Sequence, residues 1–362
     1  MITIIIVFLI TLTVLVFVHE LGHFLMAKLF GIRVDEFAIG FPPKIYSKKV
    51  GETRYAINLI PFGGYVKIWG EDPEEGVVMS EREQKRNLSF APRWKQAIIL
   101  LSGIFFNIIF AWIFISISLN LGLISTKIKD SPLDIKDAKV MIVSVLKDSP
   151  AELAGLKVGD RIISADSKIA DSISVVQQEI STGDKVSLLY ERNGKNNIVD
   201  VVGKEGLVED KKAIGVSMEM VGIAKYGFFK SFVVGAKLTV LETKSIAIGL
   251  KDFLIKVFSF KKGVLSDVSG PVGLAKMSGV AMQFGLSYFL GFVAMISINL
   301  ALINLIPFPA LDGGRVFLLA IEAIIRRKIK PIVFNLLNGI GFILLMVLMV
   351  AITIKDIWFA GK

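Results

Sequence analysis

The N-terminal stretch MITIIIVFLITLTVLVFVHELGH, residues 1–23, joins a long apolar run to three ionisable side chains. Residues 1–18 carry no charge, and His19, Glu20 and His23 follow directly. A helix needs about 20 apolar residues to cross a bilayer. A cleaved signal peptide would show a basic start and a small-residue cleavage site, and neither is present. We therefore predict a retained transmembrane helix over residues 1–27.

Three further runs without charge indicate a polytopic membrane protein. The whole chain is 53% hydrophobic and 20% charged, whereas soluble domains average about 45–50% and about 25%. This composition excludes an ordinary soluble enzyme, a disordered chain and a disulfide scaffold. The absence of cysteine excludes thiol catalysis, cysteine-ligated zinc and iron–sulfur clusters. Beside the first helix, we predict transmembrane helices within residues 96–122, 284–314 and 331–355.

The basic residues give an orientation in the membrane. Arg93 and Lys95 precede the second predicted helix, and residues 326–328 (Arg-Arg-Lys) precede the fourth. Because Lys and Arg concentrate on the cytoplasmic side of membrane helices, both segments are expected in the cytoplasm and both termini outside. The net charge of +10 is spread over loops. It favours contact with anionic lipid headgroups rather than with nucleic acid.

His19 and His23 are the two histidines of the chain. Positions i and i+4 share one helical face, so both imidazoles can reach one ion, and Glu20 between them can act as general base. Ionisable groups inside a membrane helix are costly and therefore indicate function. The alternative is a packed or interfacial histidine pair with a glutamate that extends toward water.

A catalytic zinc usually takes three protein ligands, and without a third histidine the remaining ligand must be a carboxylate. Asp312 is the candidate. It lies in residues 304–314 (Asn-Leu-Ile-Pro-Phe-Pro-Ala-Leu-Asp-Gly-Gly), where two prolines and two glycines interrupt the helix. Such irregular backbone is tolerated at membrane depth when it is buried or lines a wet cavity. The alternative is that Asp312 caps a helix over residues 314–325.

Taken together, these motifs resemble the site-2 protease family of intramembrane metalloproteases, in particular its bacterial RseP/RasP type. The similarity covers nearly the whole chain in matching order. It implies that His19, His23 and Asp312 bind one Zn²⁺, that Glu20 activates water, and that Asn304 holds the substrate backbone. It also implies location in the bacterial cytoplasmic (inner) membrane.

Residues 55–67 alternate weakly and predict a β-hairpin with a turn at Gly63-Gly64, within a cytoplasmic loop over residues 28–95. This hairpin resembles the family's membrane-associated β-loop. The resemblance implies that Gly63, Gly64 and Tyr65 help present an extended substrate. Asn107 resembles the end of a Gly-Pro-x-x-Asn element in which Ile104 here replaces the proline.

Residues 128–206 suggest a compact extracytoplasmic α/β domain. Ser149-Pro150-Ala-Glu152 predicts a helix start, and two strands over residues 186–202 predict a hairpin with an Asn193-Gly194 turn. The stretch 149–162 resembles the PDZ domains of envelope proteases, and the length leaves room for one such domain. PDZ grooves bind peptide ends, but a steric filter against folded substrates is equally open. A post-PDZ segment over residues 207–283 contains an amphipathic surface stretch, residues 226–262.

The fold class expected is therefore a polytopic α-helical membrane protein with four transmembrane helices, a cytoplasmic membrane-associated β-hairpin and an extracytoplasmic PDZ-like domain. The expected function is zinc-dependent cleavage of transmembrane segments. The resemblance implies single-span anti-sigma factors or remnant signal peptides as substrates, with lipid as the other partner. Three rival classes are an inactive PDZ scaffold, a transporter with intramembrane carboxylates and a lipid-tethered soluble-type zinc peptidase. Metal content separates the scaffold, and repeated halves would mark the transporter.

Overall fold

The computed structural model describes residues 2–71, 79–126, 132–192, 194–208, 211–259 and 268–360. Of the predicted features, the first residue of the hairpin turn, Asn193, and the predicted start of the PDZ-like domain at residue 128 lie outside these ranges. The chain divides into two compact units. The first comprises Met1–Ile115, Thr239–Gly285 and Phe289–Lys362, and the second comprises Ser116–Leu238 and Leu286–Tyr288.

Among the described residues, four helices are long and apolar enough to cross a membrane, and each overlaps one of the four predicted transmembrane segments. They are α1 (Ile2–Leu29), α3 (Arg93–Leu121), α8 (Leu286–Leu305) and α10 (Pro331–Ala360). The helix α3 continues through Ile104 without a break.

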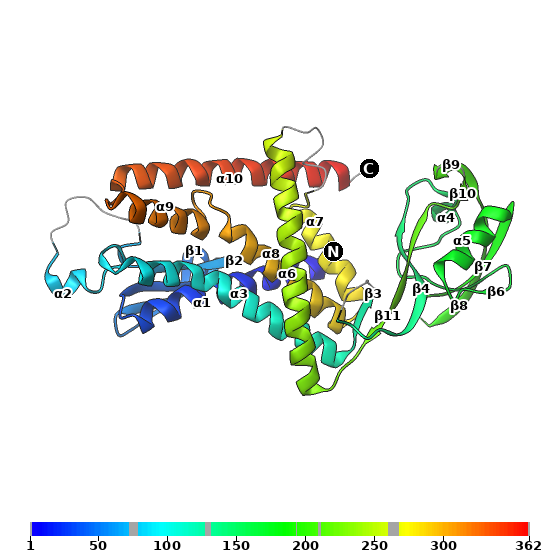
Figure 1. Cartoon of the computed structure of the whole chain (residues 1–362), viewed down its shortest axis with the longest axis horizontal. Coiled ribbons are helices and arrows are strands. Elements are labelled where there is room, and N and C mark those ends of the chain that lie inside the picture. Colours follow the sequence, from blue (N-terminus) through cyan, green and yellow to red (C-terminus); the bar gives the residue numbers. More distant parts are fainter. Residues whose placement is uncertain are drawn as a thin grey trace. The chain divides into compact units, whose positions relative to one another are not determined.

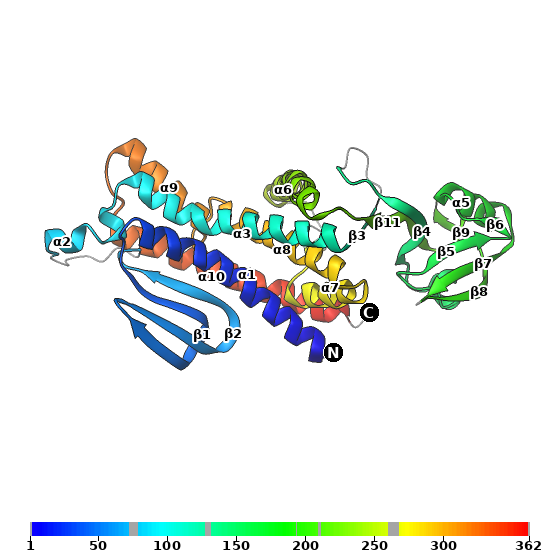
Figure 2. The same cartoon turned by 90° about the horizontal axis from the view of Figure 1, so that it is seen from below.

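In the first unit, α3 runs alongside α1 in both views (Figures 1 and 2). The two helices are antiparallel and very close, since a Cβ on Gly22 would lie 2.6 Å from the carbonyl oxygen of Ser102. Ala27 of α1 and Ile99 of α3 belong to one buried core that also contains Ile32. The remaining helices of this unit are α2 (Glu81–Gln84), α7 (Pro271–Gln283) and α9 (Asp312–Ile325), with a 3₁₀ turn at Leu88–Phe90.

Two long antiparallel strands, β1 (Val34–Val50) and β2 (Thr53–Ile68), form a sheet beside α1 (Figure 2). The predicted turn at Gly63-Gly64 is wrong, because the chain turns at residues 51–52 and both glycines lie within β2. A Cβ on Gly64 would lie 2.5 Å from the carbonyl oxygen of Ala38. Gly64 therefore permits close contact with β1. The chain reverses before it, because residues 54–57 run parallel and residues 64–67 antiparallel to residues 36–39. Residues 36–39 of β1 have partners on both halves of β2, at 54–57 and 64–67.

The second unit contains a seven-stranded sheet among the described residues, with the order β3-β11-β4-β5-β7-β8 and β6 paired to β5. The side chain of Ser149 accepts a hydrogen bond from the backbone of Glu152, as predicted for the helix start. The strand β11 pairs along β4, so the sheet extends past the predicted boundary at residue 206. Its core includes Val140, Ile162 and Leu188. The elements are β3 (Leu123–Thr126), β4 (Lys136–Val145), α4 (Pro150–Leu153), β5 (Arg161–Ala165), β6 (Lys168–Ile169), α5 (Ile173–Thr182), β7 (Lys185–Arg192), β8 (Lys195–Val202) and β11 (Val216–Ala224), with a separate pair β9 (Lys204–Val208) and β10 (Lys211–Ala213).

The helix α6 (Phe228–Phe258) contributes residues to both units. It occupies most of the predicted amphipathic stretch and exposes Phe228 and Phe229 at its start. Residues 260–267, which include the end of that stretch, lie outside the described part of the chain.

Candidate metal centre

His19 and His23 lie on one face of α1, and both are buried. Their rings meet edge to face with centroids 4.7 Å apart, and their Nε2 atoms are 3.1 Å apart. Helical spacing alone brings the two side chains together, as expected from positions i and i+4.

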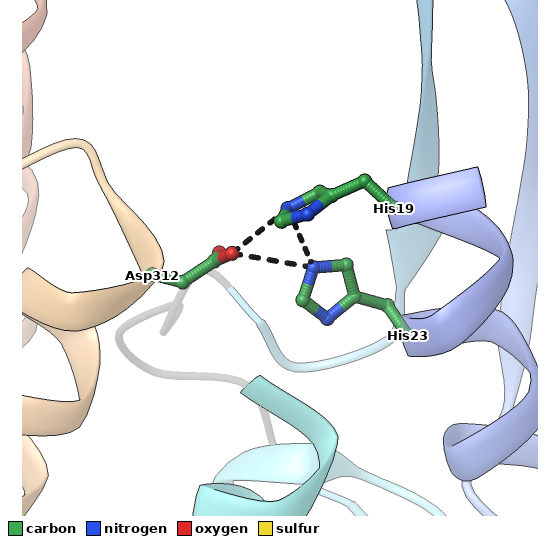
Figure 3. A group of neighbouring side chains, drawn as sticks. All are labelled: His19, His23 and Asp312. Atoms are coloured by element: carbon green, nitrogen blue, oxygen red, sulfur yellow. Dashed lines mark hydrogen bonds and ion pairs between the residues drawn. The ribbon is translucent and has the colours of Figure 1, made fainter. Parts of the chain in front are cut away.

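Asp312 faces both imidazoles (Figure 3). Its Oδ2 lies 2.9 Å from Nε2 of His19 and 3.4 Å from Nε2 of His23. Asp312 is the first residue of α9, and the residue at the N-cap position is Leu311. The alternative interpretation as the cap of a helix over 314–325 is therefore wrong.

The chain between α8 and α9 brings Asp312 to this position. Beta carbons at Gly313 and Gly314 would lie 2.3 Å from the carbonyl oxygen of Leu305 and 2.0 Å from that of Phe308. Only glycine therefore permits the first turn of α9 to pack so closely on the preceding loop. The loop is also held by Asn338 of α10, whose Oδ1 accepts a hydrogen bond from the backbone of Ala310.

The three side chains fit a zinc ion. Tetrahedral zinc binds nitrogen and oxygen at about 2.0–2.2 Å, which separates ligand atoms by about 3.3–3.6 Å. Of the observed separations, 3.4 Å lies within this range, and 2.9 and 3.1 Å are slightly shorter. In addition, Oδ2 of Asp312 is buried and has no partner among the described residues besides the two imidazole nitrogens that face it. A buried carboxylate oxygen beside two imidazole nitrogens is a donor set that a divalent cation satisfies.

The helix α3 forms one wall of the centre. The carbonyl oxygen of Ile99 lies 2.8 Å from Nδ1 of His23. One turn later, a Cβ on Gly103 would lie 2.4 Å from Nε2 of His23 and 2.7 Å from Cε1 of His19. Any larger residue at position 103 would therefore collide with the histidine pair.

Glu20 is held beside the centre by the sheet. Its Oε2 accepts a hydrogen bond of 3.0 Å from the backbone N–H of Val66 in β2. The N–H of Val66 is thus directed away from β1 and toward the carboxylate. Glu20 lines a cavity of about 220 Å³. The other lining residues are Val16, His19, Leu300, Asn304, Ala310, Leu311 and Asp312.

Asn304 belongs to the same cavity, and its Nδ2 lies 3.3 Å from Nε2 of His19. The predicted strand residues are arranged differently. Gly63 packs against Val16, since a Cβ on Gly63 would lie 3.1 Å from Cγ1 of Val16. The hydroxyl of Tyr65 donates to Glu36 and does not line the cavity.

Three contacts of the centre were not assigned from the sequence: the carbonyl of Ile99, the small size of Gly103 and the amide of Asn107. Asn107 is completely buried, and its Nδ2 lies 3.3 Å from Nδ1 of His19. Their spacing of four residues places all three on one face of α3. This spacing is a usable signal only when α3 is known to pack on the histidine pair.

Comparisons with known proteins identify the family of the chain. The family model described as Peptidase family M50 matches residues 7–348. The protein named "Putative zinc metalloprotease CPE1693" of Clostridium perfringens is 34% identical over 351 residues, covering 95% of this chain and 96% of the relative. "Zinc metalloprotease RasP" of Oceanobacillus iheyensis is 31% identical over 442 residues, covering 98% and 99%.

A solved PDZ domain of an SdrC-like protein from Listeria innocua is 25% identical over 22% of this chain and 92% of that chain. Its TM-score of 0.20 is too low to bear on the fold. The family assignment depends instead on the match that extends from α1 to α10 and includes His19, His23 and Asp312. The chain therefore belongs to peptidase family M50, the site-2 proteases, as its motifs predicted.

Proposed function

We propose that this protein is a zinc endopeptidase that cleaves transmembrane segments of single-span membrane proteins within the bilayer. The observation that carries the proposal is the convergence of His19, His23 and Asp312, with Glu20 at the same cavity. The histidines and Glu20 belong to α1, a helix long and apolar enough to span a membrane. The zinc metalloprotease names of the relatives support zinc as the cofactor.

In this proposal, each residue has a distinct task. His19, His23 and Asp312 hold the ion. A zinc ion bound there would lower the pKa of a water molecule toward about 7 and polarise the scissile carbonyl. The Glu20 carboxylate takes the proton of the attacking water and delivers it to the leaving amine. The Asn304 amide, 3.3 Å from His19 Nε2, donates to the developing oxyanion.

The substrate is proposed to bind as a strand along residues 63–66 of β2. A transmembrane helix hides its carbonyls in hydrogen bonds, so cleavage requires local unwinding. The unwound backbone needs new partners, and a strand edge supplies them by strand addition. The bond from the N–H of Val66 to Glu20 supports this position, because it directs that edge toward the proposed base. Tyr65 contributes through the sheet, where its hydroxyl binds Glu36.

The proposed setting is the bacterial cytoplasmic membrane, with both termini outside. Arg93 at the start of α3 and Lys328 before α10 support cytoplasmic placement of those helix ends. The proposed substrate classes are single-span anti-sigma factors that another protease has already trimmed and remnant signal peptides. Both keep only a short segment outside the bilayer.

A reconstitution experiment tests the proposal. The zinc-loaded protein in liposomes should cut a single-span substrate, and mass spectrometry should locate the cut within the apolar segment. Added chelator should abolish the cut, and zinc should restore it. A cut located in a soluble tail, or cleavage unaffected by chelation, would contradict the proposal.

The domain predicted over residues 128–206, which belongs to the second unit, is proposed to be a PDZ-like domain outside the cytoplasm that works as a size filter. An excluded-volume filter would spare intact membrane proteins and admit substrates that another protease has already trimmed. A deletion variant is practicable because the chain enters and leaves this domain at neighbouring points: the N–H of Tyr226 donates to the carbonyl of Leu119 at 3.1 Å. A short Gly/Ser bridge can therefore replace residues 123–224 and remove the sheet as a whole.

The deletion variant is expected to cut a full-length substrate that the complete protein ignores, and both should cut the trimmed substrate. Cleavage is measured by gel mobility after zinc content has been shown to be equal. If the variant still ignores the full-length substrate, the filter is wrong. If it also loses the trimmed substrate, peptide docking in the PDZ groove is the better account.

A further inference from the structure

We propose that Asn107 is a positioning residue of the metal centre. Its side-chain amide accepts a hydrogen bond from Nδ1–H of His19 and thereby leaves Nε2 of that imidazole free to bind the ion. This inference rests on the proposed function, since it assumes that the centre binds zinc.

The imidazole nitrogen of His19 that faces the other ligands is Nε2. Nε2 of His19 lies 3.1 Å from Nε2 of His23 and 2.9 Å from Oδ2 of Asp312. A neutral imidazole has one protonated and one unprotonated nitrogen. If Nε2 binds the metal, Nδ1 must carry the proton, and this buried N–H then needs an acceptor.

Asn107 is placed to supply that acceptor. Its side chain is completely buried, Nδ2 lies 3.3 Å from Nδ1 of His19, and Oδ1 has no hydrogen-bond partner among the described residues. A half-turn of the terminal amide exchanges its nitrogen and oxygen. This turn directs Oδ1 at Nδ1–H, so a buried acceptor without a partner meets a buried donor that requires one.

The second histidine shows the same arrangement. Nδ1 of His23 lies 2.8 Å from the carbonyl oxygen of Ile99, which can only accept. His23 is therefore already held with its proton on Nδ1 and its Nε2 directed at the centre. Because α1 and α3 are antiparallel, His23 meets Ile99 and His19 meets Asn107, eight residues later on the same face of α3. The two histidines thus have equivalent outer partners from one helix.

The backbone at Asn107 is fixed as well. Its carbonyl oxygen accepts a hydrogen bond of 2.9 Å from the hydroxyl of Ser297 on α8. Asn107 therefore connects α8 with the histidine pair of α1. Because this backbone is fixed, the Asn107 side chain holds the orientation of the imidazole more firmly than a mobile surface group would.

Three variants of the full-length protein test the role through zinc affinity. Asn107→Leu keeps the volume but removes the acceptor, and it should weaken zinc binding by about 10–100-fold, the usual loss for an outer-shell partner. Asn107→Asp keeps the acceptor and should bind zinc within about 3-fold of the wild type. Asn299→Leu is the matched control, because its amide donates to Met295 of its own helix. Dissociation constants are measured by competition with a chromophoric chelator.

Nitrogen-15 NMR of the histidine rings gives a second readout that does not depend on turnover. The chain contains two histidines, so the spectrum has few signals and His23 serves as an internal reference. In the zinc-loaded wild type, both Nδ1 atoms should carry a proton. In Asn107→Leu, the Nδ1–H signal of His19 should shift or exchange rapidly, whereas that of His23 should remain.

Several results would overturn the inference. They are an unprotonated Nδ1 on His19 in the zinc-loaded wild type, unchanged zinc affinity in Asn107→Leu, and an equal loss in Asn107→Leu and Asn107→Asp. An unprotonated Nδ1 on His19 in the wild-type spectrum overturns the inference even if the leucine variant fails to fold, and the comparison of Asn107→Asp with the wild type still measures the effect of a retained acceptor. A wild type that binds no zinc would instead contradict the proposed function.

Discussion

Glu20→Gln is expected to bind zinc as the wild type does and to lose about 10²–10⁴-fold in cleavage rate, the usual cost of a missing general base. Glutamine keeps the size of the side chain and a carbonyl oxygen. That oxygen can accept the hydrogen bond from the N–H of Val66 that Oε2 of Glu20 accepts. The variant therefore retains the position of the side chain but cannot take up a proton at neutral pH.

The measurement combines metal analysis with the initial rate of cleavage of a trimmed single-span substrate. Glu322→Gln is the matched control. The Glu322 carboxylate also accepts one backbone hydrogen bond, from Ile329, but it does not line the cavity that Glu20 lines. The control should keep the wild-type rate. A Glu20→Gln variant with near-wild-type turnover would refute the role of Glu20 as the base.

Asp312→Ala is expected to lose zinc and activity together. The carboxylate is the third donor of the group, and the described residues include no other His, Cys, Asp or Glu in this cluster. Removal of a residue that only hydrogen-bonds a metal ligand lowers metal affinity by about 10–100-fold. Removal of a direct ligand should therefore lower zinc affinity by more than about 100-fold. Zinc content should therefore fall from about one ion per chain to a small fraction. The alanine variants of His19 and His23 should behave alike.

Metal content is measured by mass spectrometry after dialysis against buffer with a defined free zinc concentration. Asp184→Ala is a suitable control because the side chain of Asp184 is 99% exposed. That variant should retain its zinc. Full zinc occupancy in Asp312→Ala would show that another group completes the centre.

The strand arrangement shows how far sequence patterns reach. The alternation over residues 55–67 predicted a hairpin with its turn at the glycine pair, whereas these residues all belong to one strand, β2. Gly63 has a φ of +73°, which suits a turn, yet it lies within β2 and packs on Val16 of α1. Glycine serves both turns and close approach, and only the partner strand distinguishes the two. The residues 42–43, Pro-Pro, concealed the long partner β1, because proline is rare inside strands.

The features that the sequence by itself determined are those that arise within one segment of the chain. Apolar length predicted the four helices, and the helical repeat placed His19 and His23 on one face. Counting ligands then pointed to Asp312 as the third. Tertiary packing decided everything that joins distant segments: Glu20 to Val66, 46 residues later, and Asn107 to His19, 88 residues earlier. Backbone periodicity repeats over a few residues and is visible in any single chain. Contacts between helices and strands depend on shape complementarity over the whole fold, which no local pattern encodes.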